Sequence, residues 1–254
     1  MKSLVNTVKN MSKVSKAKGN SIDFLDHSLS EPMCQKIIQT MNSVDLNTLG
    51  ITGKNSESDP YHFQKKLNRV TIEGNDDYRL VLFFIKKGTI MPIHDHPNMS
   101  VYFKLMFGQL KYTQYDKVAD KYRYNQFSND EYDEILHTKQ QVHAKKTNEK
   151  IIDDGELLLV RPSCGNIHKF VAQEDSCFFD ICLPNYTSDS LRRITYFNEI
   201  SNDLNTCAKH GDKCDTILEY HTTPPVLPVG FEIAELDYRG DFELSQKFIW
   251  INQR

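Results

Sequence analysis

The strongest structural signal in this sequence is the stretch "MPIHDHPNMSVYFKLMFGQ", Met91–Gln109. It begins with two histidines one residue apart, His94 and His96, and continues into a run of alternating apolar residues that stops at Gly108. In a β-strand, residues i and i+2 point to the same face. If a strand ends at these histidines, both imidazoles project to one side, and they are either half of a metal site or two polar side chains at a strand end.

The same β signal recurs on both sides of this stretch. Short apolar runs bounded by glycine, proline or polar residues predict further strands within Tyr78–Gly88, Gln109–Asp116, Glu156–Pro162, His168–Ala172 and Ser176–Pro184. Several short strands at close spacing favour a sandwich or barrel over a βαβ fold. One helix is predicted before them, with Ser30 at its N-cap and Pro32 in its first turn. Its apolar stripe is Ile37, Ile38 and Met41.

Composition and charge restrict the class of protein. The chain has 254 residues and a net charge of −3, and five lysines lie in its first twenty residues. The remaining 26 basic residues face 34 acidic ones, which argues against nucleic acid as a partner. No stretch approaches the roughly 20 apolar residues of a membrane helix, and the N-terminus lacks the apolar region of a secretory signal, so we expect none. We therefore expect neither nucleic-acid nor membrane binding.

The six cysteines form no CxxC pair, so we expect reduced thiols and a cytosolic or nuclear location. We also expect a monomer. Residues 1–22 are expected to be a basic, flexible N-terminus. The lack of acids and the helical spacing of Leu4, Val8 and Met11 are compatible with a mitochondrial transit peptide, but the segment has no arginine, so we expect a loosely ordered helix. Residues 23–254 are expected to form a single domain. Within it, residues 117–154 show no clear hydrophobic periodicity, and we interpret them as an insertion. The proline-rich tail is predicted to wrap the barrel and end on an edge strand.

A third ligand for a metal would have to come from another histidine. Two buried imidazoles on one face require partners for their ring nitrogens, and a metal ion supplies one to each. Of the other seven histidines, His168 stands in a strand context, after the turn residues Pro162 and Gly165. A turn directly before a ligand holds that ligand with little freedom.

This layout also matches the cupin pattern. Its first motif is a glycine, five residues, HxH, an acidic residue and a later glycine, and Gly88, His94, His96 and Gly108 fall on it. Val101 replaces the acid, so the predicted site has three histidines and no carboxylate. Three neutral imidazoles leave the full charge of a divalent cation uncompensated, which favours a thiolate ligand. The same three ligands also suit zinc.

"IMPIHDHPNMSVYFKLMFGQLKYTQYD", "GNIHKF" and "DICLPNYTSDSLRRITYF" resemble blocks of the cysteamine dioxygenase and plant cysteine oxidase family. The resemblance implies a cupin double-stranded β-helix barrel, here with N-terminal helices. It also implies an Fe(2+) thiol dioxygenase that uses O2 to convert an N-terminal cysteine of proteins or peptides, or cysteamine, to the sulfinic acid. In the family this reaction can serve as an oxygen-sensing step in the N-degron pathway.

Carried over by position, the resemblance makes His94, His96 and His168 the iron ligands. It places Asp180 beside the metal, where the carboxylate would orient a ligand histidine or bind the substrate ammonium. Tyr186 matches a family tyrosine at the pocket mouth, which would place the substrate or O2, so the resemblance makes Asp180 and Tyr186 the candidate catalytic residues. From the sequence pattern alone, Asp180 fits a solvent-facing residue on an edge strand nearly as well as it fits a functional residue. Tyr186 likewise fits an aromatic side chain packed in a loop.

The chain departs from the family pattern at several positions. Asn98 stands where glycine is usual, and Cys164 replaces a glycine before "GNIH". Ile194 occupies the position of a cysteine that some members cross-link to a tyrosine, so that link to Tyr196 is excluded. Two alternatives stay open: a cupin that binds a metal or ligand without oxygenase activity, and a zinc-dependent cupin isomerase.

Overall fold

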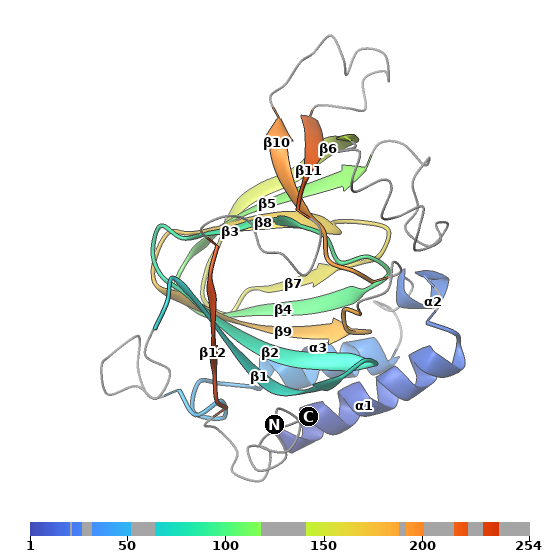
Figure 1. The fold of residues 1–254 in the computed structure, drawn as a ribbon. Coiled ribbons are helices and arrows are strands. Elements are labelled where there is room, and N and C mark those ends of the chain that lie inside the picture. Colours follow the sequence, from blue (N-terminus) through green and yellow to red (C-terminus); the bar gives the residue numbers. More distant parts are fainter. Residues whose placement is uncertain are drawn as a thin grey trace.

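The structure is a computed structural model, and it describes residues 1–20, 22–26, 32–51, 64–117, 141–187, 192–200, 216–222 and 231–238. Within this part the chain is mainly β, as predicted. Twelve strands form two facing sheets, with helices against the outer side of one of them (Figure 1). One sheet has the order β12-β1-β2-β9-β4-β7, and the other closes into a barrel with the order β10-β11-β6-β5-β8-β3.

The strands follow one another along the chain after the helices. Their bounds are β1 Leu67–Asn75, β2 Tyr78–Ile85, β3 Ile90–His94, β4 Ser100–Phe107, β5 Leu110–Lys117, β6 Gln141–Ile152, β7 Leu157–Val160, β8 Ile167–Ala172, β9 Ser176–Leu183, β10 Tyr196–Ile200, β11 Thr216–Thr222 and β12 Ile233–Leu236. The helices are α1 Lys2–Ala17, α2 Ile22–Asp26 and α3 Pro32–Asn42.

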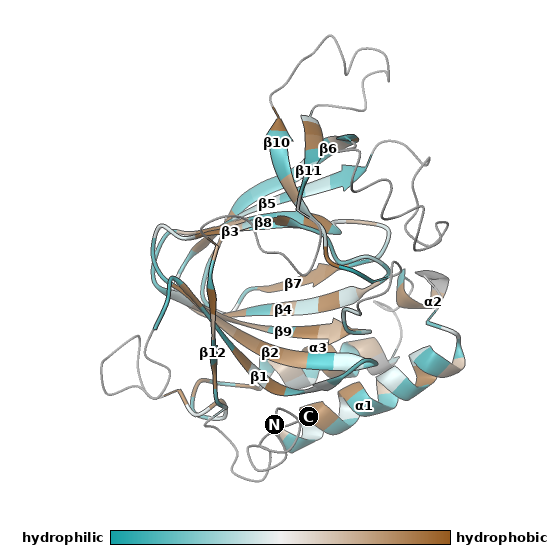
Figure 2. Cartoon of the chain, viewed as in Figure 1, coloured by the Kyte–Doolittle hydropathy of each residue, from teal (hydrophilic) through white to brown (hydrophobic). Residues whose placement is uncertain are grey.

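The N-terminus differs from the flexible segment that we expected. Residues 2–17 form α1, which alternates between hydrophobic and hydrophilic residues along its length (Figure 2). Leu4, Val8 and Met11 are fully buried, in one core cluster with α3 and the outer face of the β1-β2-β9-β4 sheet. Burial of an apolar stripe stabilises an amphipathic helix that would be marginal alone. The predicted helix at Pro32 is confirmed as α3, with Ile37 and Met41 buried; the predicted cap, Ser30, lies outside the described residues.

The predicted insertion at 117–154 is wrong over its second half. Residues Gln141–Ile152 form β6, a full barrel strand that pairs with β5 and β11. Most of its side chains face solvent or lie half-buried, so the strand is polar and shows no apolar alternation. The register is fixed by its neighbours instead. Residues 118–140 of the predicted insertion lie outside the described part.

Gly108 explains the end of the opening stretch. It stands between β4 and β5 with φ +92°, a left-handed conformation that favours glycine. A Cβ there would lie 2.3 Å from Ser176 Oγ, at the start of β9, which pairs with β4 in the same sheet. The turn therefore requires glycine for both its backbone angle and its space.

The predicted edge strand near the C-terminus is confirmed as β12. It pairs in parallel with β1, with Leu67 opposite Ile233 and Val70 opposite Leu236. This strand brings the tail to the rim of the space between the sheets, while residues 239–254 lie outside the described part. None of the described helices is long and apolar enough to cross a membrane.

Candidate metal centre

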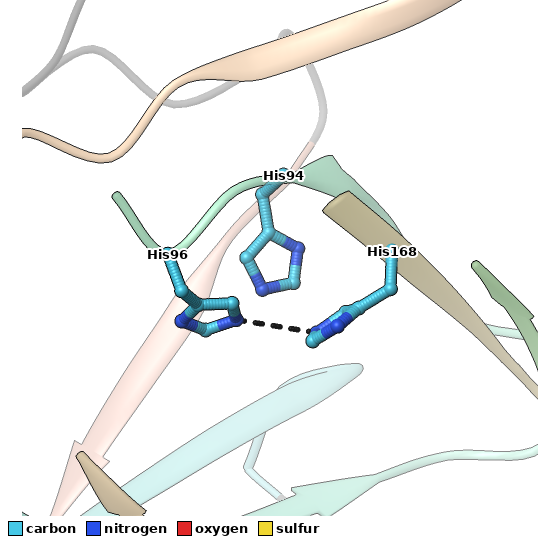
Figure 3. A group of neighbouring side chains, drawn as sticks. All are labelled: His94, His96 and His168. Atoms are coloured by element: carbon cyan, nitrogen blue, oxygen red, sulfur yellow. Dashed lines mark hydrogen bonds between the residues drawn. The ribbon is translucent and has the colours of Figure 1, made fainter. Parts of the chain in front are cut away.

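Three histidines converge between the two sheets (Figure 3). His94 is the last residue of β3, and His96 follows it two residues later. His168 is the second residue of β8, and the antiparallel pairing of β3 with β8 places its Cα opposite that of His94. The expectation that His94 and His96 project together agrees with this geometry, since their ring centroids are 4.9 Å apart. His168 lies 4.8 Å from each of the other two rings.

The spacing of the ring nitrogens fits a small divalent metal. One ligand nitrogen from each histidine lies within 4.8 Å of the others. His96 Nε2 and His168 Nε2 are 3.2 Å apart. Two nitrogens each about 2.1 Å from one ion would have this separation at an angle of about 100°, close to tetrahedral or octahedral geometry. Among the described residues these three form the group that could hold a metal; His27, His62, His137 and His210 lie outside that part.

Hydrogen bonds to the opposite ring nitrogens fix the tautomers of two of these histidines. His94 Nδ1 lies 2.8 Å from the carbonyl oxygen of Pro92, which can only accept, so Nδ1 carries the proton. The hydroxyl of Tyr186 donates to the carbonyl oxygen of Asp95 (2.8 Å) and therefore accepts from His96 Nδ1. Both rings then present an unprotonated Nε2 to the centre. This is the usual way in which a protein orients histidine ligands for a metal.

The three imidazoles are also held in the neutral form. Burial lowers the pKa of His94 to about 4. The pKa values of His96 and His168 are lowered well below their usual range, mainly by burial and further by the neighbouring histidines. A neutral imidazole is the form that binds a metal. The donor set therefore fits a divalent cation.

Asn166 fixes the backbone of His96, and the sequence interpretation missed this residue. Its Oδ1 accepts from the His96 N–H (3.0 Å) and its Nδ2 donates to the His96 carbonyl (2.7 Å). The two bonds hold the segment after β3 against the turn before β8. The signal was present in "GNIHKF", where an amide side chain stands two residues before His168.

A cavity of about 720 Å³ opens onto the three histidines. Apolar side chains make up much of its lining, including Val81, Phe83, Phe170 and Ile194. Asp180 and Tyr186, the two other residues that the sequence singled out, both line it. Asp180 points inward from β9 and is buried, rather than facing solvent, and its Oδ1 has no hydrogen-bond partner among the described residues. Burial raises the pKa of this carboxyl well above its usual range.

The departures from the expected motif have local explanations. Asn98 adopts φ +55°, a conformation that asparagine tolerates better than most residues, so the turn after His96 is compatible with the loss of glycine. Val101 is buried against Val160 and Cys182, and it contributes no carboxylate. Cys164 is half-buried, with its sulfur 3.9 Å from Asp116, and does not line the cavity.

Comparison with known proteins assigns the family. The PCO_ADO family model matches residues 36–242, so the chain belongs to this family. It is 26% identical over 140 residues to "Probable 2-aminoethanethiol dioxygenase" of Dictyostelium discoideum; the alignment covers 54% of this chain and 58% of that protein. It is also 26% identical over 129 residues to "Plant cysteine oxidase 1" of Arabidopsis thaliana, covering 50% of this chain and 40% of that one. These alignments thus span roughly half the length of the relatives.

Solved structures with a similar fold include cupins. A cupin superfamily protein from Desulfitobacterium hafniense has a TM-score of 0.34 and 9% identity, over 54% of this chain and 96% of that chain. An RmlC-like cupin from Desulfovibrio desulfuricans has a TM-score of 0.33 and 12% identity, over 53% of this chain and 97% of that chain.

Proposed function

We propose that this chain is an iron(II)-dependent thiol dioxygenase that acts on the N-terminal cysteine of proteins or peptides, and also on cysteamine. The observation that supports this most is the convergence of three neutral, buried imidazoles with no carboxylate among them, in a cavity large enough for a substrate. Family membership and the names of the relatives point to the same chemistry. The net reaction, R–SH + O2 → R–SO2H, places both oxygen atoms on sulfur and needs no organic cosubstrate.

His94, His96 and His168 would hold the iron through their Nε2 atoms. Bound iron(II) would supply coordination sites for the thiolate and O2 and the electrons that begin the activation of O2. Because the three imidazoles are neutral, they do not offset the charge of the cation, and an anionic thiolate is favoured as a further ligand. The apolar lining of the cavity limits access of water to the reacting sulfur.

Tyr186 and Asp180 have different roles in this proposal. Tyr186 keeps the proton on His96 Nδ1 through its own donation to the carbonyl of Asp95, and so positions the ligand ring. Asp180 offers a buried carboxylate without a partner at Oδ1, which suits the ammonium group of a cysteine or cysteamine. A substrate ammonium beside it would favour the ionised carboxylate over the neutral form that burial favours.

The direct test uses protein loaded with iron under anaerobic conditions and then exposed to ¹⁸O2. A peptide that begins with cysteine, free cysteine and cysteamine should be compared side by side by mass spectrometry. We expect a gain of two labelled oxygen atoms on the peptide, and none with the His168→Ala variant. If the purified protein holds zinc and oxidises no thiol, the proposal fails in favour of zinc-dependent cupin chemistry. If it holds iron and still oxidises no thiol, a non-oxygenase cupin is favoured.

An oxygen-sensing role follows if proteins are the substrates. The rate of sulfinic acid formation would then depend on O2 at physiological concentrations, and the oxidised N-terminus would enter N-degron turnover. Measurement of the initial rate against O2 concentration tests this: saturation at very low O2 would contradict a sensing role.

A further inference from the structure

The cavity contains a second group of polar side chains, which the proposed chemistry does not use. Arg69 from β1 and Arg79 from β2 both line it, beside Asp180 and Cys182 from β9. Within the β2–β9 pair, Arg79 stands opposite Cys182, and the next inward position, Val81, stands opposite Asp180. The arginines therefore lie on the sheet that faces the histidine-bearing strands β3 and β8.

Arg79 has few partners for a partly buried cation. An arginine side chain carries five N–H donors, and within the described part of the chain one of them is hydrogen-bonded, from Nη2 to Thr71 Oγ1 (2.7 Å). Glu235 is near, but it accepts its hydrogen bond from Arg69. Burial lowers the pKa of Arg79, and the positive charge of Arg69 lowers it further. No Arg79 nitrogen is a buried atom without a partner, so within the described structure its remaining donors are open to water or a ligand in the cavity.

Arg69 also has an unused donor. Its Nε is buried with no hydrogen-bond partner in the described structure. Both guanidinium groups line one cavity, and among the described residues Glu235 forms its ion pair with Arg69 while no carboxylate forms one with Arg79.

Asp180 does not compensate this charge. No ion pair joins it to either arginine among the described residues, and its Oδ1 lacks a partner. The pKa of the Cys182 thiol responds to both kinds of charge. Burial raises this pKa and Asp180 raises it further, while Arg79 and Arg69 lower it. The lining of one cavity therefore carries a carboxyl group at Asp180 and, at a separate point, the Arg79 guanidinium, which has no ion-pair partner among the described residues and stands opposite Cys182. A ligand that carries an ammonium group and a carbonyl or carboxylate group would match both points.

We propose that Arg79, supported by Arg69, binds the carbonyl or carboxylate oxygen of a cysteinyl substrate and so selects cysteine and cysteine-starting peptides over cysteamine. This inference rests on the proposed function, since it assumes that the substrate thiol approaches the three histidines. A cysteinyl unit carries its thiol, ammonium and carbonyl on adjacent carbons. Cysteamine has the thiol and the ammonium but no carbonyl. The planar guanidinium fork suits such oxygens better than an ammonium does.

The test measures binding without turnover. Iron-loaded wild type and Arg79→Met are titrated anaerobically by calorimetry with L-cysteine, a Cys-Gly peptide amide and cysteamine. Loss of a charge-assisted hydrogen bond should weaken binding of the two cysteinyl ligands roughly 10- to 100-fold. Cysteamine should change by less than about threefold, because it offers Arg79 no oxygen. Arg79→Lys should recover part of the lost affinity.

The ratio of cysteinyl to cysteamine affinity is taken within each variant, so partial misfolding affects both terms alike. Lys87→Met, which removes a positive charge from an exposed residue outside the cavity, is the matched control and should leave the ratio unchanged. Weakening of L-cysteine alone would assign the contact to a carboxylate, and weakening of both cysteinyl ligands would assign it to the carbonyl.

An unchanged ratio, or equal weakening of all three ligands, would overturn the inference. Its failure is separable from that of the proposed function. If the ratio shifts in Arg79→Met while wild type oxidises no thiol, only the dioxygenase proposal fails. If thiols are oxidised and the ratio does not shift, only the role of Arg79 fails.

Discussion

The hydroxyl of Tyr186 offers the sharpest test of how the centre is held together. In Tyr186→Phe the ring remains and one oxygen is lost, so packing is nearly preserved. Two buried groups then lose a hydrogen bond to the hydroxyl: the carbonyl of Asp95 and the Nδ1–H of His96. Leaving such groups unsatisfied costs about 1–3 kcal/mol. The His96 ring is also free to change its tautomer, and loss of this kind of support weakens metal binding roughly 10- to 100-fold.

Two measurements check this prediction. Urea unfolding of the metal-free variant should show a loss of about 1–3 kcal/mol of unfolding free energy. Anaerobic competition of Fe(2+) against a chromophoric chelator should show the weaker affinity.

Tyr196→Phe is the matched control. Tyr196 lines the same cavity, with its ring centroid 6.3 Å from that of His94, but its hydroxyl makes no hydrogen bond within the described residues. Both quantities should stay close to wild type in this variant. If Tyr186→Phe binds iron as tightly as Tyr196→Phe does, the hydroxyl does not position His96 and the reasoning is refuted.

Three further predictions follow from the same structure. Asn166→Ala removes both hydrogen bonds to the backbone of His96, so unfolding free energy should fall by about 1–3 kcal/mol in urea and iron affinity should fall with it; unchanged values of both would contradict the role of the amide. Gly108→Ala would place a Cβ 2.3 Å from a side-chain oxygen at φ +92° and should cost at least about 2 kcal/mol, whereas Gly155→Ala, at φ +84° in open space, should cost about 1 kcal/mol; equal urea midpoints would refute the steric argument. Anaerobic Fe(2+) at 100 times its Kd should stabilise wild type by about 2.7 kcal/mol and raise its melting temperature, while His168→Ala should show no such rise.

Local patterns in the sequence were sufficient for most of the strands and for the candidate centre. The apolar alternation of β4 and the i, i+2 spacing of His94 and His96 depend on neighbouring residues alone, because strand geometry repeats every two residues. The turn before His168 is local as well. Their roles as metal ligands remain a prediction, but the structure brings all three rings together.

The sequence pattern failed where an element is defined by its partners. β6 has a mostly exposed, polar surface, so no hydrophobic period marks it, and its place comes from pairing with β5 and β11. For α1, the helical spacing was visible in the sequence. Its burial depends on an apolar surface that strands from much later in the chain provide.

The sequence by itself determined which residue types were available. These are the three histidines His94, His96 and His168 in or next to predicted strands, a valine in place of an acid at position 101, and the arginines Arg69 and Arg79, which belong to no sequence motif. Only the tertiary structure decided which of them meet. The β3–β8 register places His168 opposite His94, and the β2–β9 register turns Arg79 into the same cavity as Asp180. Such contacts are set by hydrogen bonding between strands far apart in the chain, and a one-residue slip would turn each side chain to the other face.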